Sequence, residues 1–322
     1  MKGQIKNGLR VGAVLVAATL GLAQVGMSAS NAVAYTVPAQ RQAVPGTINY
    51  VEGQATLNGQ PLAPGETGNT VVQPNEALDT QAGYVEVLLT PGAFLRVGHN
   101  SEVVMQSLGL ANIQIQVTRG SAMIEAADLV KDAVMQVNMD GATTSIEKHG
   151  LYEFDANQQS VRVLDGKVKV LEAGSVKTIG KGDQVVLTAA NLKTHGFDKQ
   201  VAEADPLYVW SKTRSEAEAQ SNVRLASNIA TYGGWYGPGW YWDPLWASYA
   251  FLPGAGLLYS PFGWGFYSPA FVGYYGGFYG RGFYGRGYYV HRYYGRPGVA
   301  TGIHGFAVGA FHSGGFHAAG RR

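Results

Sequence analysis

Aromatic and arginine side chains gather in the last third of the chain, and their chemistry is that of binding rather than catalysis. Arginine beside tyrosine or phenylalanine binds RNA through charge and stacking, or binds a second copy of the same segment through cation–π contacts. Tryptophan and tyrosine stack on sugar rings or lie at a membrane interface. The candidate interaction residues are therefore Trp235, Trp240, Trp242, Trp264, Arg281, Arg286, Arg292 and Arg296.

Sequence motifs that would indicate catalysis lack the context that catalysis needs. Gly280–Gly285 satisfies G-x-G-x-x-G, but a nucleotide site needs a strand before it and a helix after it, which a Gly-Tyr repeat does not favour. His312 and Ser313 are adjacent, whereas a nucleophile and its base are brought together by folding and oriented by a third group. We predict no enzymatic activity and no catalytic residue.

The remaining titratable residues favour neither a paired-carboxylate site nor a metal site. Glu86, Glu102 and Asp165 alternate with apolar residues or lie in turns, so they are expected on solvated strand faces. Four of the seven histidines lie in the last third, but the chain has no cysteine, and carboxylates are rare near them. We predict no cofactor and no metal. The absence of cysteine also excludes a disulfide scaffold.

The N-terminus has the pattern of an export signal. Basic residues precede the 13-residue apolar run Val11–Ala23, and small residues follow it. This pattern is typical of a signal peptide over residues 1–34, cleaved after Ala34. The run is shorter than the ~20 residues that span a bilayer, although an extension through Ala34 comes close, so an uncleaved anchor stays open. We expect an exported protein, in the periplasm or at the cell surface, without a nucleic-acid partner.

Residues 47–200, after a linker at 35–46, are predicted to form an all-β domain. Short runs such as Tyr84–Leu89 and Ile113–Val117 alternate apolar and polar residues, and turn residues separate them. Three strand entries share a Gly-x-apolar-x-apolar pattern, at spacings too uneven for a regular solenoid. The expected fold is a rolled or sandwich-like sheet, with β-solenoid character as the other option.

A helix and a tail of different composition follow. Asp205-Pro206 is typical of a helix start and Gly233-Gly234 of a helix end, so residues 203–231 are predicted as a helical connector. Its loose apolar stripe suits a binding partner or, as we favour, packing of Trp210 onto the β-domain. Residues 232–322 hold 23 of the 45 glycines and 14 of the 19 tyrosines, and this low-complexity tail is expected to be disordered.

Charge separates the same regions. The whole chain carries +2, but the signal segment carries +3 and the tail +5, which leaves −6 on residues 35–231. The mature protein is thus an acidic β-domain joined to a basic aromatic tail. We expect an envelope protein, a polysaccharide or a membrane surface as partner, with self-association through the tail as a further option.

The β-domain resembles the FecR domain over about residues 47–190. The matching segments are the strand Gly53–Leu57, the turn Pro64-Gly65, the stretch Val85–Val103, and the closing strands Val161–Val170 and Gly180–Leu187. Pro91-Gly92 stands where the family usually has Asp-Gly, and His149-Gly150 replaces a common Gly-Thr pair. The resemblance implies an extracytoplasmic module first met in sigma-factor regulators. Those members carry a cytoplasmic domain and a membrane helix before the module, so anti-sigma activity is not expected to carry over.

Two functions follow from these observations. The main expectation is a non-enzymatic exported protein that binds or assembles at the cell envelope through its β-domain and aromatic tail. The alternative is a periplasmic signalling component, which receives a signal through the FecR-like domain and acts through a separate membrane partner.

Overall fold

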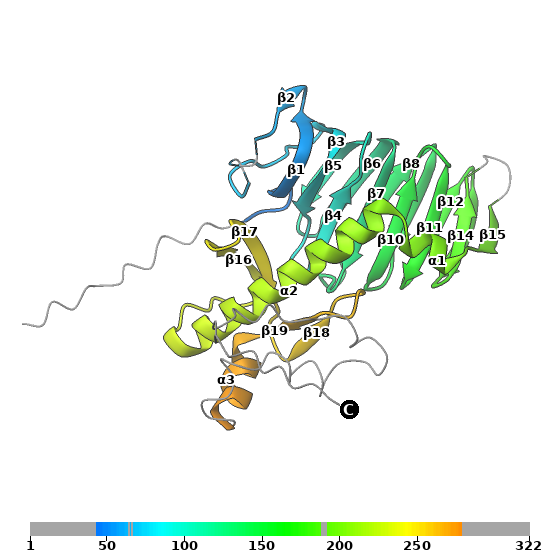
Figure 1. Cartoon of the computed structure of the whole chain (residues 1–322). Helices are drawn as coiled ribbons and strands as arrows, with labels where there is room; N and C mark the ends of the chain where they lie inside the picture. Colours follow the sequence, from blue (N-terminus) through cyan, green and yellow to red (C-terminus); the bar gives the residue numbers. More distant parts are fainter. Residues whose placement is uncertain (1–42, 64, 66, 188–191, 279–322) are drawn as a thin grey trace, which may run out of the picture. The chain divides into compact units, whose positions relative to one another are not determined.

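β-Strands dominate the part of the chain that the computed structural model describes, which is residues 43–278 without positions 64, 66 and 188–191 (Figure 1). The main sheet consists of β1 (Ile48–Leu57), β2 (Gln60–Pro61), β3 (Ala77–Leu88), β4 (Ala93–Val97), β5 (Glu102–Gly109), β6 (Asn112–Arg119), β7 (Ser121–Ala126), β8 (Val134–Met139), β9 (Ala142–Ile146), β10 (Gly150–Asp155), β11 (Ser160–Asp165), β12 (Lys167–Glu172), β13 (Ser175–Gly180), β14 (Asp183–Val186) and β15 (Lys193–Gly196). Helices α1 (Lys199–Glu203) and α2 (Pro206–Tyr232) follow, and then β16 (Gly239–Asp243), β17 (Ser248–Leu252), β18 (Leu257–Tyr259), β19 (Gly265–Tyr267) and α3 (Pro269–Phe278). Among these described residues, no helix combines the length and the apolar character that a membrane span requires.

One long strand joins the two halves of the sheet. The first residues of β3 pair with β5, and its last residues, Val85–Leu88, pair with β4. The strand order is β13-β12-β9-β8-β6-β5-β3-β4-β7-β10-β11-β14-β15, and β13 also contacts β14, so the sheet rolls up and nearly closes. The all-β, rolled fold expected from the sequence is confirmed.

Alternating burial and tight turns explain why these residues form strands. Along β6 and β8, buried apolar residues alternate with half-exposed polar ones. The predicted turn Asn58-Gly59 has both residues in the left-handed region, with φ of 48° and 75°, which suits a two-residue hairpin. At Gly166, which leads into β12, a side chain would meet the Tyr152 hydroxyl at 2.1 Å, so this position also needs glycine.

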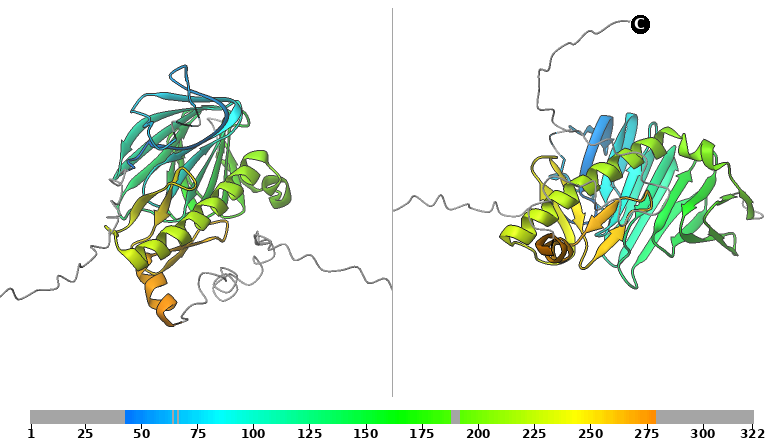
Figure 2. Two further views of the ribbon diagram at one scale, coloured as in Figure 1. Left: turned by 60° about the vertical axis from the view of Figure 1, so that its left-hand side comes forward. Right: turned by 60° about the horizontal axis from the view of Figure 1, so that its bottom comes forward.

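Helix α2 covers the outer face of the sheet. It crosses in front of β4 and β7 (Figures 1 and 2). Asp205 accepts a hydrogen bond from the Leu207 amide at 2.8 Å, and the helix ends at Gly233, as its start and end signals predicted. Trp210 stacks on Tyr84 of β3 with ring centroids 4.7 Å apart. The favoured interpretation of this helix, packing onto the β-domain, is therefore the one observed.

The first part of the predicted tail is folded rather than irregular. Hairpins β16–β17 and β18–β19 and helix α3 all pack against α2 (Figure 1). Glycine contributes no side chain to a core, but the aromatic residues between the glycines bury a large apolar surface. Phe251 and Phe266 are fully buried, and Trp240 is 8% exposed. The expectation of a disordered tail is therefore wrong for residues 239–278, which form β16 to α3. Residues 279–322, the signal segment and the linker up to position 42 lie outside the described residues.

Candidate binding groove

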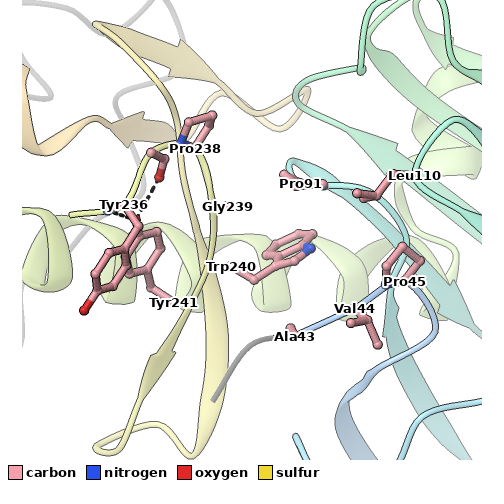
Figure 3. Close-up of a pocket in the computed structure, with 11 residues that line it drawn as sticks. Ala43, Val44, Pro45, Pro91, Leu110, Tyr236, Pro238, Gly239, Trp240 and Tyr241 are labelled. Carbon is pink, nitrogen blue, oxygen red and sulfur yellow. Dashed lines mark hydrogen bonds between the residues drawn. The ribbon is translucent and has the colours of Figure 1, made fainter. Parts of the chain in front are cut away.

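An open groove of about 590 Å³ lies where the first hairpin meets the β-domain (Figure 3). One wall comes from the start of the described chain, from the β3–β4 turn and from the β5–β6 turn. The other wall comes from the segment between α2 and β16 and from β16 itself. The lining residues are Ala43, Val44, Pro45, Pro91, Leu110 and Tyr236–Tyr241.

Aromatic packing fixes the hairpin wall. The indole of Trp240 meets the ring of Phe94 edge-on at 5.0 Å and the ring of Phe251 at 5.9 Å. The Tyr241 hydroxyl donates to the Gly237 carbonyl at 2.8 Å and accepts from the Tyr236 amide at 3.0 Å. These contacts hold the loop before β16 in one shape, with the rings of Tyr236 and Tyr241 nearly parallel.

One buried side-chain nitrogen beside the groove has no partner. Trp240 Nε1 is buried and has no acceptor among the described residues. Figure 3 shows the indole directed toward the opposite wall, with its nitrogen on that side. No charged side chain and no hydroxyl nucleophile lines the groove apart from the tyrosines. The lining is therefore uncharged and largely apolar, and it holds no acid–base or nucleophilic constellation.

A buried ion cluster beneath α2 sets the position of this hairpin relative to the sheet. It consists of Glu86 on β3, Arg96 on β4, Glu125 on β7, and Arg214 and Glu218 on α2. Glu86 and Arg96 are directly opposite each other in the ladder, with 2.8 Å between Oε2 and Nε. Arg96 also contacts Glu125 at 2.5 Å, and Arg214 contacts Glu86 at 2.9 Å. The cluster thus joins three strands to the helix.

Burial and charge set the protonation of the cluster. Burial raises the pKa of Glu86, but Arg214 and Arg96 outweigh it and bring that pKa down to about 2. Burial and the neighbouring charge of Glu86 hold the pKa of Glu218 well above its usual range, against the effect of Arg214. The two carboxyl groups that share Arg214 are thus pushed in opposite directions, Glu86 toward the charged form and Glu218 toward the neutral form.

Two asparagines connect the cluster and α2 to the hairpins. Asn49 donates to Glu86, to Glu218 and to the Tyr249 carbonyl, and it accepts from the Tyr249 amide at 2.7 Å. Asn222 on α2 donates to the Phe251 carbonyl at 2.7 Å and accepts from the Tyr267 amide at 2.8 Å. Because buried amides satisfy backbone groups of both hairpins, the groove wall is held in register with the sheet.

The predicted interaction residues have different surroundings. Trp240 lines the groove, and Trp235, just before it in the chain, is 37% exposed. Trp242 packs edge-on against Tyr249, and Trp264 packs against two of the buried aromatic clusters. The remaining predicted positions, Arg281, Arg286, Arg292, Arg296 and the cleavage point after Ala34, lie outside the described residues.

One sequence expectation about the acids is wrong. Glu86 was expected on a solvated strand face, but it is fully buried because α2 covers that face. Glu102 and Asp165 are half-buried and pair with Arg119 and Lys181, respectively. The signals that point to the cluster are a basic residue opposite Glu86 across the Pro91-Gly92 turn and the i, i+4 pair of Arg214 and Glu218 on α2. Within the described ranges, no group of three or more His, Asp or Glu residues is placed to hold a metal ion.

Comparisons with known proteins identify the β-domain. Residues 76–169 match the family described as FecR protein. This segment runs from β3 to β12 and contains three members of the ion cluster and the turn residues Pro91 and Leu110 of the groove, but neither α2 nor the hairpins. The chain therefore carries a FecR domain, as its strand and turn patterns indicated.

Two solved structures are similar in part, both of candidate anti-sigma factors from Parabacteroides distasonis. The first has 16% sequence identity and a TM-score of 0.35, and it covers 40% of this chain; this chain spans 63% of its length. The second has 14% identity and a TM-score of 0.33, with 54% of this chain and 80% of that chain covered. No curated protein matches the chain.

Proposed function

We propose that the protein is an exported, non-enzymatic signalling component, which receives a signal by binding a partner in the groove and passes it to a separate membrane protein. FecR modules were first met in sigma-factor regulators, and the FecR match over residues 76–169 supplies this context. The observation that carries the proposal is the groove itself, an uncharged and largely apolar hollow lined both by the FecR-type domain and by the segment after α2.

The arrangement of the groove supports transmission as well as binding. Its two walls belong to different parts of the chain, the FecR-type domain and the segment after α2, and the ion cluster and the two asparagines join them. An occupant that contacts both walls stabilises the observed arrangement of the two parts over any other, and such a difference in affinity is what shifts a conformational equilibrium. A partner that binds the outer surface of α2 and the hairpins would then distinguish the occupied from the empty protein.

A transcription experiment tests the signalling role. The gene is deleted in its native host, and the strain is complemented with the wild-type chain, with Trp240→Phe or with the control Trp246→Phe. We expect the deletion and Trp240→Phe to change the transcript levels of one shared set of genes, and Trp246→Phe to restore them, because Trp246 lies at the hairpin tip away from the groove. A deletion that leaves the transcript profile unchanged would refute signalling.

Export is tested separately by the N-terminal sequence of the protein purified from the envelope fraction. We expect Tyr35 as the first residue. A chain that starts at Met1 contradicts cleavage, and recovery only from the cytoplasm contradicts export.

Exposed aromatic side chains favour a second candidate function, attachment to the envelope. Tyr232, Tyr236 and Tyr274 are exposed by 83%, 74% and 66%, respectively, and Trp235, which lies between the first two in sequence, is 37% exposed. Such rings stack on sugars or lie at a membrane interface. Co-sedimentation of the mature protein with peptidoglycan and with anionic vesicles tests this function, and a loss of sedimentation in a Trp235→Ala/Tyr236→Ala variant is the expected result. Sedimentation with neither material would contradict it.

A further inference from the structure

We infer that the outward face of β6, β8 and β9 binds an uncharged polysaccharide, whose hydroxyl groups bond to the amide and hydroxyl side chains of these strands. Seven residues form this surface, the amide face: Gln106, Gln114, Gln116, Gln136, Asn138, Thr143 and Ser145. None of them lines the groove, so this binding site is separate from the proposed signalling function.

Strand register places the amide face on the solvent side of the sheet. It consists of two rows across β6, β8 and β9, which are Gln114, Gln136 and Ser145, then Gln116, Asn138 and Thr143. A bulge in β5 brings Gln106 beside the second row. The residues that alternate with these rows along the three strands are buried, whereas all seven members of the amide face are half-buried. Helix α2 packs on β4 and β7 instead, so the amide face stays accessible.

Hydrogen bonds between the side chains hold the amide face in one arrangement. Gln106 donates to Gln116 at 3.1 Å, and Asn138 donates to Gln106 at 2.6 Å. Thr143 donates to Asn138 at 2.8 Å, and a bond of 3.1 Å joins β8 and β9 in the other row. A primary amide has two N–H donors and a carbonyl that accepts twice, so each amide keeps capacity for a ligand. Because the side chains are already oriented, little binding free energy is lost in ordering them.

The composition of the amide face excludes most other partners. It has no Lys or Arg, which nucleic acids and anionic lipids require. It has no aromatic residue either, although aromatic residues and Arg are enriched at the centres of protein–protein interfaces. The next side chain in the first row, Lys169, already pairs with Glu147 at 3.1 Å. A charged ligand therefore finds no counter-charge within the two rows.

Shape and hydrogen-bonding chemistry favour a sugar polymer. Small molecules bind in concave sites, whereas a strand face without projecting rings is shallow and suits a long ligand that contacts it at many points. Each sugar hydroxyl group both donates and accepts, and it therefore matches amide and hydroxyl side chains. Neighbouring strands lie about 4.8 Å apart, close to the length of one sugar unit in an extended chain. A polysaccharide that lies across the strands thus presents hydroxyl groups to β6, β8 and β9 in turn.

Affinity electrophoresis of the full mature chain tests this binding site, in native gels with increasing amounts of glucomannan, an uncharged polysaccharide with an extended backbone. We expect the mobility of the wild type to fall as the glucomannan concentration rises, relative to a reference protein in the same gel. A mobility that does not respond to glucomannan overturns the inference.

Two variants locate the binding site on the amide face. Gln114→Val/Gln136→Val removes two amides and introduces residues that favour strands, and we expect its apparent affinity to fall at least about tenfold. The matched control is Gln54→Val/Gln81→Val, which changes exposed glutamines on β1 and β3 and is expected to bind like the wild type. Thr143→Val is a milder second variant, because it keeps the shape of the side chain and loses only the hydroxyl. Unchanged affinity in the variants that unfold at the wild-type temperature overturns the inference.

Two further measurements distinguish other occupants. Trp235→Ala/Tyr236→Ala is expected to keep the wild-type affinity for glucomannan, and a loss confined to this variant would assign the sugar to the exposed aromatic residues and overturn the inference. Sedimentation velocity without polysaccharide is expected to show the same oligomeric state for the wild type and for Gln114→Val/Gln136→Val. A dimer that this variant dissociates would show that a second copy covers the amide face, which also overturns the inference.

Discussion

Replacing Arg96 with methionine removes the cation that two buried carboxylates share. Glu86 Oε2 loses its contact with Arg96 Nε at 2.8 Å, and Glu125 Oε2 loses its contact with Nη1 at 2.5 Å. Glu86 keeps Arg214 at 2.9 Å from its other oxygen, so the cost falls mainly on Glu125, which keeps only a hydroxyl donor, Ser215, among the bonds of the described structure.

The size of the effect follows from the burial of all three side chains. Breaking a buried ion pair by removal of one partner costs about 3–5 kcal/mol, because the remaining charge stays desolvated. We expect the free energy of unfolding of Arg96→Met to fall by about this amount. The double variant Arg96→Met/Glu125→Leu removes the stranded charge as well, so we expect it to recover more than half of the loss.

Urea unfolding of the mature chain at pH 7, followed by far-UV circular dichroism, measures these differences. Arg119→Met is the matched control, because Arg119 pairs with Asp79 on the surface with half of its side chain exposed. Exposed pairs contribute about 0–1 kcal/mol, so this control is expected to lose no more than that. If Arg96→Met loses as little as Arg119→Met, the cluster is not desolvated and the reasoning fails.

Three further predictions concern stability, each measured by urea unfolding. Burial raises the pKa of Glu153 from 4.5 to about 7, although Arg162 acts in the opposite direction. The contribution of Glu153 to the free energy of unfolding, up to about 3 kcal/mol, is therefore complete below pH 4.5 and is lost as the pH rises through 7. Glu153→Gln is expected to flatten this dependence of stability on pH, and an unaltered dependence would contradict the shift. Asp205→Ala removes the N-cap of α2 and is expected to cost about 1 kcal/mol, whereas no loss would show that the cap is dispensable. Gly53→Ala places a side chain 2.2 Å from the Ala82 carbonyl oxygen at a φ of +72°, whereas Gly59→Ala has a similar φ of +75° and open space around it. The first variant is therefore expected to lose at least twice as much free energy of unfolding as the second. Equal losses would contradict the close approach at Gly53.

The sheet and the main helix are predictable from the sequence because their signals are local. Alternation of apolar residues defines β6 and β8, Asn58-Gly59 defines a turn, and Asp205-Pro206 with Gly233 delimits α2 to within a few residues. The weak apolar stripe of α2 has a structural reason. One face packs on the sheet through Leu207 and Trp210, and other positions pack on the hairpins through Leu225 and Ala226, so its buried residues do not lie in one narrow stripe.

The burial of Glu86 could not be read from its own strand. Its alternation with Val85 and Val87 places it on the face opposite the core, and the face is dry only because a helix more than a hundred residues later covers it. The arginines that compensate it come from β4 and from α2. Local periodicity assigns a face to a residue, but it does not say whether a later element covers that face.

Composition misleads in the segment after α2 for a related reason. A high glycine content raises the entropic cost of folding, but the glycines of residues 239–278 are interspersed with large aromatic residues, and hydrophobic stabilisation scales with buried apolar area rather than with the number of residues. Phe251, Phe266 and Tyr249 are almost completely buried, and two hairpins with short turns need few residues to bring them together. The same folding back packs Trp240 on Phe94 of β4, and the groove lies between this hairpin and the β3–β4 turn. The proposed binding surface is therefore shared between the FecR-type domain and a segment whose composition alone suggested disorder, and neither part by itself contains both walls.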